Sequence, residues 1–146
     1  METSGAPQRL RGTVSWLLGQ TTTHAHRLVS EALGTADARR YHYSLLAALD
    51  EFGPASQADL GRRGGVDRSD VVATVNELAD KGFVERRPDP GDKRRNTVTA
   101  TPAGLAHLRH LDRVLGQAQE ALLEPLSTAE REELARLLTA VLEHHG

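Results

Sequence analysis

The residues best suited to chemistry are cations, and they are concentrated in one short segment. Residues 86–95 hold five Lys or Arg against two Asp or Glu, although the 146-residue chain has a formal net charge of −2. Within this segment Lys93, Arg94 and Arg95 follow Asp92 directly. A row of cations at a narrow turn is suited to phosphate contact, and an arginine can enter a narrow minor groove of DNA. We expect Asp92 to order the turn by accepting hydrogen bonds from Arg86 or Arg94.

Enzymatic and metal chemistry have less support in the sequence. The chain has no cysteine, which excludes disulfides, thiol nucleophiles and zinc–thiolate sites. No Ser–His–Asp arrangement, phosphate loop or HExxH motif is present, so we predict that the chain is not an enzyme and needs no cofactor. His24 and His26 point to different sides of a helix. His107 and His110 could share a helical face, with His42 brought near by folding, so a zinc-responsive regulator remains an alternative.

Two short helices joined by a glycine turn would have to position the cations. Ser56 and Asp59 have the spacing of a capping box that opens the first helix, which ends at Gly64 and Gly65. A second helix begins near Asp67 and ends at residue 82. This order is the helix-turn-helix pattern.

The second helix has an apolar back formed by Val71, Val75 and Leu78, as expected of a helix that packs on a core and presents its front to a DNA major groove. Asp70 and Glu77 make this helix net acidic, so affinity for DNA must come from arginines and lysines and must fall steeply with salt. The predicted DNA-binding residues are polar or basic and lie on the two helices and the following hairpin: Ser56, Gln57, Arg63, Arg68, Ser69, Thr74, Asn76, Arg86, Lys93, Arg94 and Arg95.

The flanking segments predict a mainly α, winged helix-turn-helix fold. Residues 83–87 and 96–99 are typical of strands and form a two-stranded wing around a turn at 88–91, with 92–95 at its tip. Helices are predicted from 10 to 33, from a cap at Thr35 or Asp37 to 52, from 102 to 122 after a Thr101 cap, and after a Ser127 capping box. We expect a dimerisation helix in 1–34, the DNA-binding region in 35–101, and dimerisation helices in 102–146. Without a long apolar run or signal core, the chain is expected to be cytoplasmic and not membrane-bound.

The residues quoted above resemble the multiple-antibiotic-resistance regulator (MarR) family of winged-helix repressors. The resemblance is carried by residues 78–94 and 98–104, and most specifically by Asp92-x-Arg94 followed by Thr101-Pro-Ala-Gly104. Lys93, Ala73, Glu77 and Ala100 depart from the family's usual residues. These departures affect the operator sequence and affinity more than the fold.

The resemblance implies a homodimer, formed by the first and the last two helices, that binds a pseudo-palindromic operator in double-stranded DNA. It also implies that Arg94 reaches the minor groove and that Asp92 orders the wing. It further implies that a small anionic or phenolic effector binds between the dimerisation helices and the DNA-binding region. Binding of this effector would cause the protein to release DNA. Trp16, His42 and Leu46 are the predicted ligand-binding residues, although the position of Trp16 beside the Leu17 and Leu18 stripe favours a dimer-core aromatic. The remaining alternative is a winged helix used only for protein–protein contact.

Overall fold

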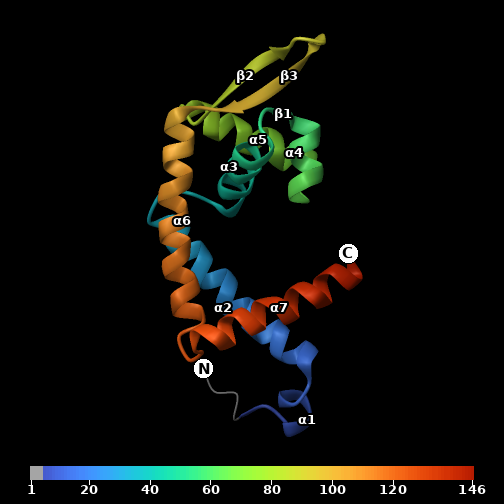
Figure 1. The fold of residues 1–146 in the computed structure, drawn as a ribbon, viewed down its shortest axis with the longest axis vertical. Coiled ribbons are helices and arrows are strands. Elements are labelled where there is room, and N and C mark those ends of the chain that lie inside the picture. The colour runs from blue at the N-terminus through green and yellow to red at the C-terminus, as the bar shows by residue number, and fades with distance from the viewer. Residues whose placement is uncertain (1–4) are drawn as a thin grey trace. The chain divides into compact units, whose positions relative to one another are not determined.

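A computed structural model describes residues 5–146, apart from the side chain of Lys93 (Figure 1). Its elements are α1 (Gln8–Arg11), α2 (Val14–Gly34), α3 (Arg40–Phe52), β1 (Ala55–Ser56), α4 (Gln57–Gly64), α5 (Arg68–Asp80), β2 (Val84–Asp89), β3 (Asp92–Ala100), α6 (Pro102–Leu122) and α7 (Thr128–His145). They form two compact units. The winged-helix unit is Val29–Leu115, and the terminal unit comprises the segments before and after it.

The winged-helix unit is built around one hydrophobic core that α3, α4, α5 and the strands share. Leu45 and Leu46 from α3 and Leu60 from α4 are at most 1% exposed. Residues 71, 75 and 78 contribute the predicted apolar back of α5, and each is at most 1% exposed. Val84 of β2 and Val98 of β3 complete the same core. Burial of each such side chain stabilises the fold by about 1.5–3 kcal/mol, so α5 and the strands are held by a common set of contacts.

The wing is a three-stranded antiparallel sheet in the order β1-β3-β2, not the predicted two-stranded hairpin. Ala55 and Ser56 pair with Val98 and Thr97, which joins the residues just before α4 to the wing. A two-residue strand is too short to produce an alternating pattern, and its partner lies some forty residues away along the chain. The sequence therefore gave no signal for β1.

The tip of the wing also differs from the prediction. Asp89 pairs with Asp92, so the turn itself lies between these two residues, and Asp92 already begins β3. The next registered pair is Pro88 with Asn96. Residues 93–95 therefore form a bulge on β3. The cationic run lies beside the tip on one strand, where a bulge bends the strand and redirects its side chains.

Helix starts and ends were predicted with mixed success. The capping box of α7 is confirmed, since Ser127 Oγ accepts from Glu130 N at 3.2 Å and Glu130 Oε1 accepts from Ser127 N at 2.8 Å. At α4 only the N-cap is confirmed: Ser56 Oγ accepts from Asp59 N at 3.1 Å, whereas the Asp59 carboxylate accepts from Arg62. The single helix expected from residue 10 is wrong, because Gly12 ends α1. Asp67 occupies the N-cap position of α5 without a side-chain cap bond.

The expected cap of α3 at Thr35 or Asp37 is also wrong. Arg39 is the N-cap, and its backbone N–H donates to Nδ1 of His42 at 3.1 Å. The signal was hidden because a histidine in the third helical position here has the role that Glu or Gln has in a capping box.

The terminal unit contains α1, most of α2, the end of α6, and α7. Arg131 ties the start of α7 to the end of α6, since its guanidinium donates to Leu123 O and Leu126 O, both at 3.1 Å, and to Glu120. No residue of α7 is buried. Large apolar side chains of this unit are exposed: Leu10, Val14, Leu17, Leu18, Leu137, Leu138, Val141 and Leu142. Among the described residues, no helix is both long and apolar enough to cross a membrane.

The junction of wing and α6 depends on a glycine. A Cβ on Gly104 would lie 2.0 Å from the carbonyl oxygen of Phe83, which also accepts the N–H of Thr101 at 3.0 Å. We predict that Gly104→Ala lowers the free energy of unfolding by about 1–3 kcal/mol or more, because the clash is with backbone. Chemical denaturation measures the effect.

Gly116→Ala, also in α6, is the matched control. A Cβ at Gly116 meets nothing within 4 Å, so this change should raise stability by up to about 1 kcal/mol through helix propensity. Equal effects of the two substitutions would contradict the close approach at Gly104.

Candidate nucleic-acid interface

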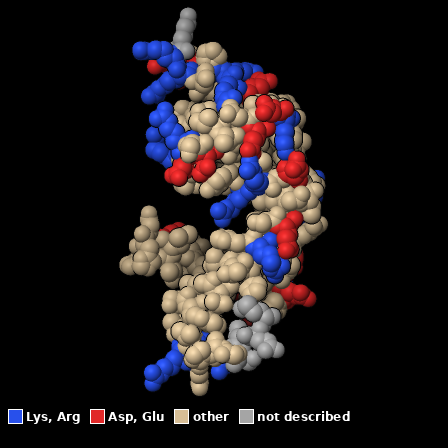
Figure 2. All heavy atoms as spheres, turned by 180° about the vertical axis from the view of Figure 1, so that it is seen from behind, with Lys and Arg blue, Asp and Glu red and all other residues tan. Residues whose placement is uncertain are grey.

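The α5 helix presents a polar front opposite its buried valine stripe. Arg68, Ser69 and Asn76 are exposed, as predicted for residues that contact DNA. Arg68 and Ser69 lie in the first turn, the end of a recognition helix that usually meets base edges. Lys and Arg side chains gather on the part of the surface that carries the winged-helix unit, with acidic side chains interspersed (Figure 2).

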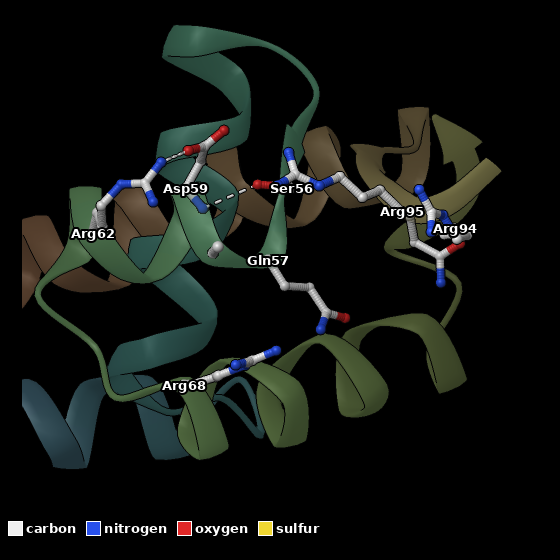
Figure 3. Close-up of a pocket in the computed structure, with 9 residues that line it drawn as sticks. Ser56, Gln57, Asp59, Arg62, Arg68, Arg94 and Arg95 are labelled. Atoms are coloured by element: carbon white, nitrogen blue, oxygen red, sulfur yellow. Dashed lines mark hydrogen bonds and ion pairs between the residues drawn. The ribbon is translucent and has the colours of Figure 1, made fainter. Parts of the chain in front are cut away.

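The basic side chains converge on a hollow of about 400 Å³, which we call the arginine hollow (Figure 3). It lies where the start of α4, the start of α5 and the bulge of β3 meet. Its described lining holds four arginines and one carboxylate, which is already paired with an arginine. The lining residues are Ser56, Gln57, Ala58, Asp59, Arg62, Arg68, Arg94, Arg95 and Asn96. A concave, cationic surface beside a helix front fits the phosphates of a duplex.

The start of α4 adds a polar contribution to this hollow. Ser56 uses its hydroxyl oxygen to cap the helix, so its N-cap geometry is fixed. The first N–H groups of a helix carry partial positive charge and commonly bind phosphate. The backbone N–H groups at the start of α4 and the arginine side chains therefore both favour a phosphate at this edge of the hollow.

The predicted role of Asp92 agrees with the structure. One oxygen of Asp92 accepts the backbone N–H of Arg94 at 3.0 Å and its Nε at 3.5 Å. The Arg94 side chain is nevertheless 93% exposed, so it remains available to a partner. Of the two arginines expected to bond Asp92, Arg94 does so. The side chain of Lys93, also predicted to bind DNA, lies outside the described residues.

Arg86 points to other partners. Its Nε donates to Gln57 Oε1 at 3.2 Å, and its Nη2 donates to Asn76 Oδ1. Gln57, Asn76 and Arg86 were each predicted to bind DNA. In the structure Arg86 is hydrogen-bonded to the other two. Arg86 joins the wing to α4 and to α5 at once.

Comparisons with known proteins agree with this geometry. A MarR-family model matches residues 34–95. The transcriptional regulator YcgE of Bacillus subtilis is 31% identical over 117 residues, which is 79% of this chain and 73% of YcgE. The chain belongs to the MarR family. The transcriptional repressor NicR of Pseudomonas putida is 33% identical over 98 residues, 67% of this chain and 62% of NicR.

The likeness extends to solved structures of the MarR family. A mutant MarR from E. coli, in a crystal structure complexed with operator DNA, superposes with a TM-score of 0.75 at 27% identity. The superposition covers 88% of this chain and 93% of that one. This MarR-family chain is a winged-helix transcriptional regulator and not an enzyme.

Two residues predicted to contact DNA, Thr74 and Arg63, have other surroundings in the structure. Thr74 was predicted to be on the front of α5 but is only 4% exposed. Positions 71, 74, 75 and 78 form one helical stripe, so Thr74 shares the buried face despite its hydroxyl. Arg63 does not line the arginine hollow and lies over the ring of Phe52 at 4.7 Å. Arg62, three residues after Asp59 on the same helical face, lines the hollow.

The predicted ligand-binding residues do not share one environment. Leu46 is 0% exposed and packs within the hydrophobic core, so its expected place in a ligand crevice is wrong. His42 is 4% exposed and belongs to the same unit, where it borders a separate hollow with Arg39, Glu77 and Lys81. Trp16 is half-buried in the terminal unit.

Two of the histidines considered for zinc, His42 and His107, have other partners. Within residues 5–146 no group of three His, Asp or Glu side chains is placed to hold a metal ion. The ring of His107 stacks on Phe83, with centroids 4.2 Å apart and planes at 11°. Burial is the main cause that lowers the pKa of His107.

Glu77, one of the two residues that make α5 net acidic, is anchored to α3. Arg39 Nη2 donates to one carboxylate oxygen, and His42 Nε2 lies 2.6 Å from the other. Because Nδ1 of His42 already accepts the N–H of Arg39, Nε2 carries the proton and donates to Glu77. Hydrogen bonds from Arg39, and then from His42, lower the pKa of Glu77 from 4.5 to about 2. The negative charge of Glu77 is thus balanced within the protein.

This anchor predicts a pH dependence of stability. The pKa of Glu77 is depressed in the folded state, so its contribution is present above about pH 4.5 and is lost as the pH falls toward 2. In Glu77→Gln, the free energy of unfolding should therefore fall less between pH 4.5 and pH 2 than in the wild type. Denaturant titrations across this range measure the difference, with Glu51→Gln at an exposed position as control. Parallel curves for Glu77→Gln and wild type would disprove the anchor's role.

Proposed function

We propose that the chain binds operator DNA as a homodimer, and that a small anionic or phenolic effector releases it. The arginine hollow is the observation that supports DNA binding most directly. It places Arg62, Arg68, Arg94 and Arg95 around one concave surface, adjacent to the exposed front of α5. With α5 in the major groove, these arginines would meet the phosphates that border it. Arg94, exposed beside the wing tip, would enter the neighbouring minor groove.

The homodimer proposal is supported by the exposed apolar residues of the terminal unit. In α7, Leu137 is 48%, Leu138 41%, Val141 53% and Leu142 73% exposed. A helix whose apolar stripe lacks a buried residue is expected to find its partner in another chain. Two-fold symmetry would present two α5 helices to successive major grooves about 34 Å apart and would require a pseudo-palindromic operator.

Repression and effector release are proposed from the relatives. NicR is a transcriptional repressor, and it shares 33% of its residues with this chain over the matched region. A repressor needs a signal that weakens DNA binding, and the absence of cysteine excludes thiol oxidation as that signal. A small ligand with higher affinity for the DNA-free conformation would shift the population away from DNA.

The DNA-binding proposal predicts a specific effect of Arg94→Ala. Removal of this side chain should weaken binding to a selected operator by about tenfold or more. If Arg94 neutralises one phosphate, the slope of log K against log salt should also become shallower by about 0.9. Fluorescence anisotropy on labelled duplexes over a salt series measures both quantities. Arg109→Ala, an exposed arginine of α6 outside the hollow, is the matched control, and an equal loss in both variants would argue against a role for the wing.

The dimer proposal predicts that Leu137→Asp or Leu138→Asp produces monomers. Either change places a carboxylate in the proposed apolar interface between the two α7 helices, where burial of an unpaired charge is strongly unfavourable. Light scattering at several protein concentrations measures the mass. Thr139→Asp, on α7 but away from the leucine stripe, should leave the dimer intact. Persistent dimers of both leucine variants would disprove an interface at α7.

A further inference from the structure

Arg86 lies where the wing, α4 and α5 meet, and its contacts suggest a role different from DNA contact. Its guanidinium bonds the side-chain oxygens of Gln57, the first residue of α4, and Asn76, near the middle of α5. We propose that Arg86 is a positioning residue: it sets the geometry between the wing and the two helices and orients the Gln57 and Asn76 amides toward DNA. This inference rests on the proposed DNA-binding function.

The strand that carries Arg86 is a rigid support. Arg86 pairs with Val98 in the antiparallel ladder of β2 and β3. Val98 is 0% exposed and also pairs with Ala55, next to the start of α4. The backbone of Arg86 is thus fixed by the sheet, and its side chain carries that fixed position to α5. A contact of this kind limits how far the wing and the recognition helix can move independently.

Only arginine can make this connection with a single side chain. The planar guanidinium presents donors in a fixed fork, so Nε and Nη2 can serve two acceptors in different directions. A lysine has a point charge on a flexible stem and would hold at most one amide in a defined direction. The chemistry of the fork, and not its charge alone, is therefore what the site uses.

The guanidinium of Arg86 also determines which end of each side-chain amide, that of Gln57 and that of Asn76, points toward it. An arginine has no acceptor, so only the carbonyl oxygen of each amide can bond to Arg86. The NH₂ groups of Gln57 and Asn76 then face away from Arg86. Gln57 lines the arginine hollow, and Asn76 is exposed on the front of α5. Both amides are thereby set as donors, suited to phosphate oxygens or to base edges that only accept, such as guanine O6 and N7.

Arg87 provides a natural control on the same strand. Successive residues of a strand point to opposite faces, and Arg87 pairs with Glu85 at 2.9 Å. Val84 is buried and Arg86 half-buried, whereas Glu85 and Arg87 are exposed. Arg87→Ala therefore removes an arginine from β2 without touching either amide.

The decisive experiment compares Arg86→Ala, Arg86→Lys and Arg87→Ala in the 146-residue chain. The probes are a duplex selected by the wild type from a random pool and an unselected duplex of equal length. Arg86→Ala and Arg86→Lys should both weaken binding to the selected duplex by about tenfold, as expected for the loss of one or two ordering hydrogen bonds. Binding to the unselected duplex should change by less than about twofold, and the salt slope should stay at the wild-type value. Arg87→Ala should match the wild type throughout.

Direct DNA contact by Arg86 would give a different result. Arg86→Lys would then keep most of the affinity, or the salt slope would fall by about 0.9 for one lost phosphate contact. Either result overturns the positioning role. A merely structural role would lower affinity for both duplexes alike, together with the melting temperature or the dimer fraction, and would overturn it too. If Arg86→Ala does not fold, Arg86→Lys, which keeps the charge and the aliphatic stem, decides.

A double-mutant cycle tests the proposed connection to α5. If Arg86 acts through Asn76, the variant carrying both Arg86→Ala and Asn76→Ala should bind the selected duplex no more than about twofold less tightly than the weaker single variant. Fully additive losses would contradict that connection. If the wild type selects no duplex at all, the proposed function fails and this inference fails with it. If the wild type selects DNA and the Arg86 variants bind equally well, this inference alone fails.

Discussion

One hydrophobic core holds the recognition helix and the wing together, and the rest of the interface depends on this shared packing. Val71, Val75 and Leu78 from α5 are buried in the same cluster as Val84 and Val98 from the wing. Loss of these contacts would leave a short helix and a hairpin, each marginal in water by itself. Because both elements bury their apolar faces in one core, their polar faces keep a constant relation to each other. A duplex can then be bound by two elements that are already in place.

Polar contacts further fix the orientation of α5 and the wing, which the hydrophobic core positions. Neighbouring residues of α5 are held on different sides, Asn76 by Arg86 of the wing and Glu77 by Arg39 and His42 of α3. The carboxylates near the interface follow a similar principle. Asp59 is paired with Arg62, Asp92 with Arg94, and Glu77 with Arg39. These acids orient arginines at close range, so a chain with a net charge of −2 can still present a cationic hollow.

The contrast between the two units has a physical basis. The winged-helix unit buries its apolar residues within one chain, whereas the terminal unit exposes leucines and valines along α2 and α7. A chain of this size with such an exposed stripe gains stability by association, since apolar area removed from water contributes about 25 cal/mol per Å². Dimerisation would also double the arginine hollow, which is how a small protein can bind a long operator.

The sequence by itself determined the parts that follow from local patterns. The valine stripe of α5, the N-caps at Ser56 and Ser127, and the bond between Asp92 and Arg94 depend on residues a few positions apart, so spacing was enough to predict them. Thr74 was misplaced only because its hydroxyl outweighed its position on the stripe. The tertiary structure alone decided β1, the Glu77 anchor, and the three-way contact of Arg86. Each of these joins residues that are distant in sequence, and such contacts are settled only when the elements pack on a common core.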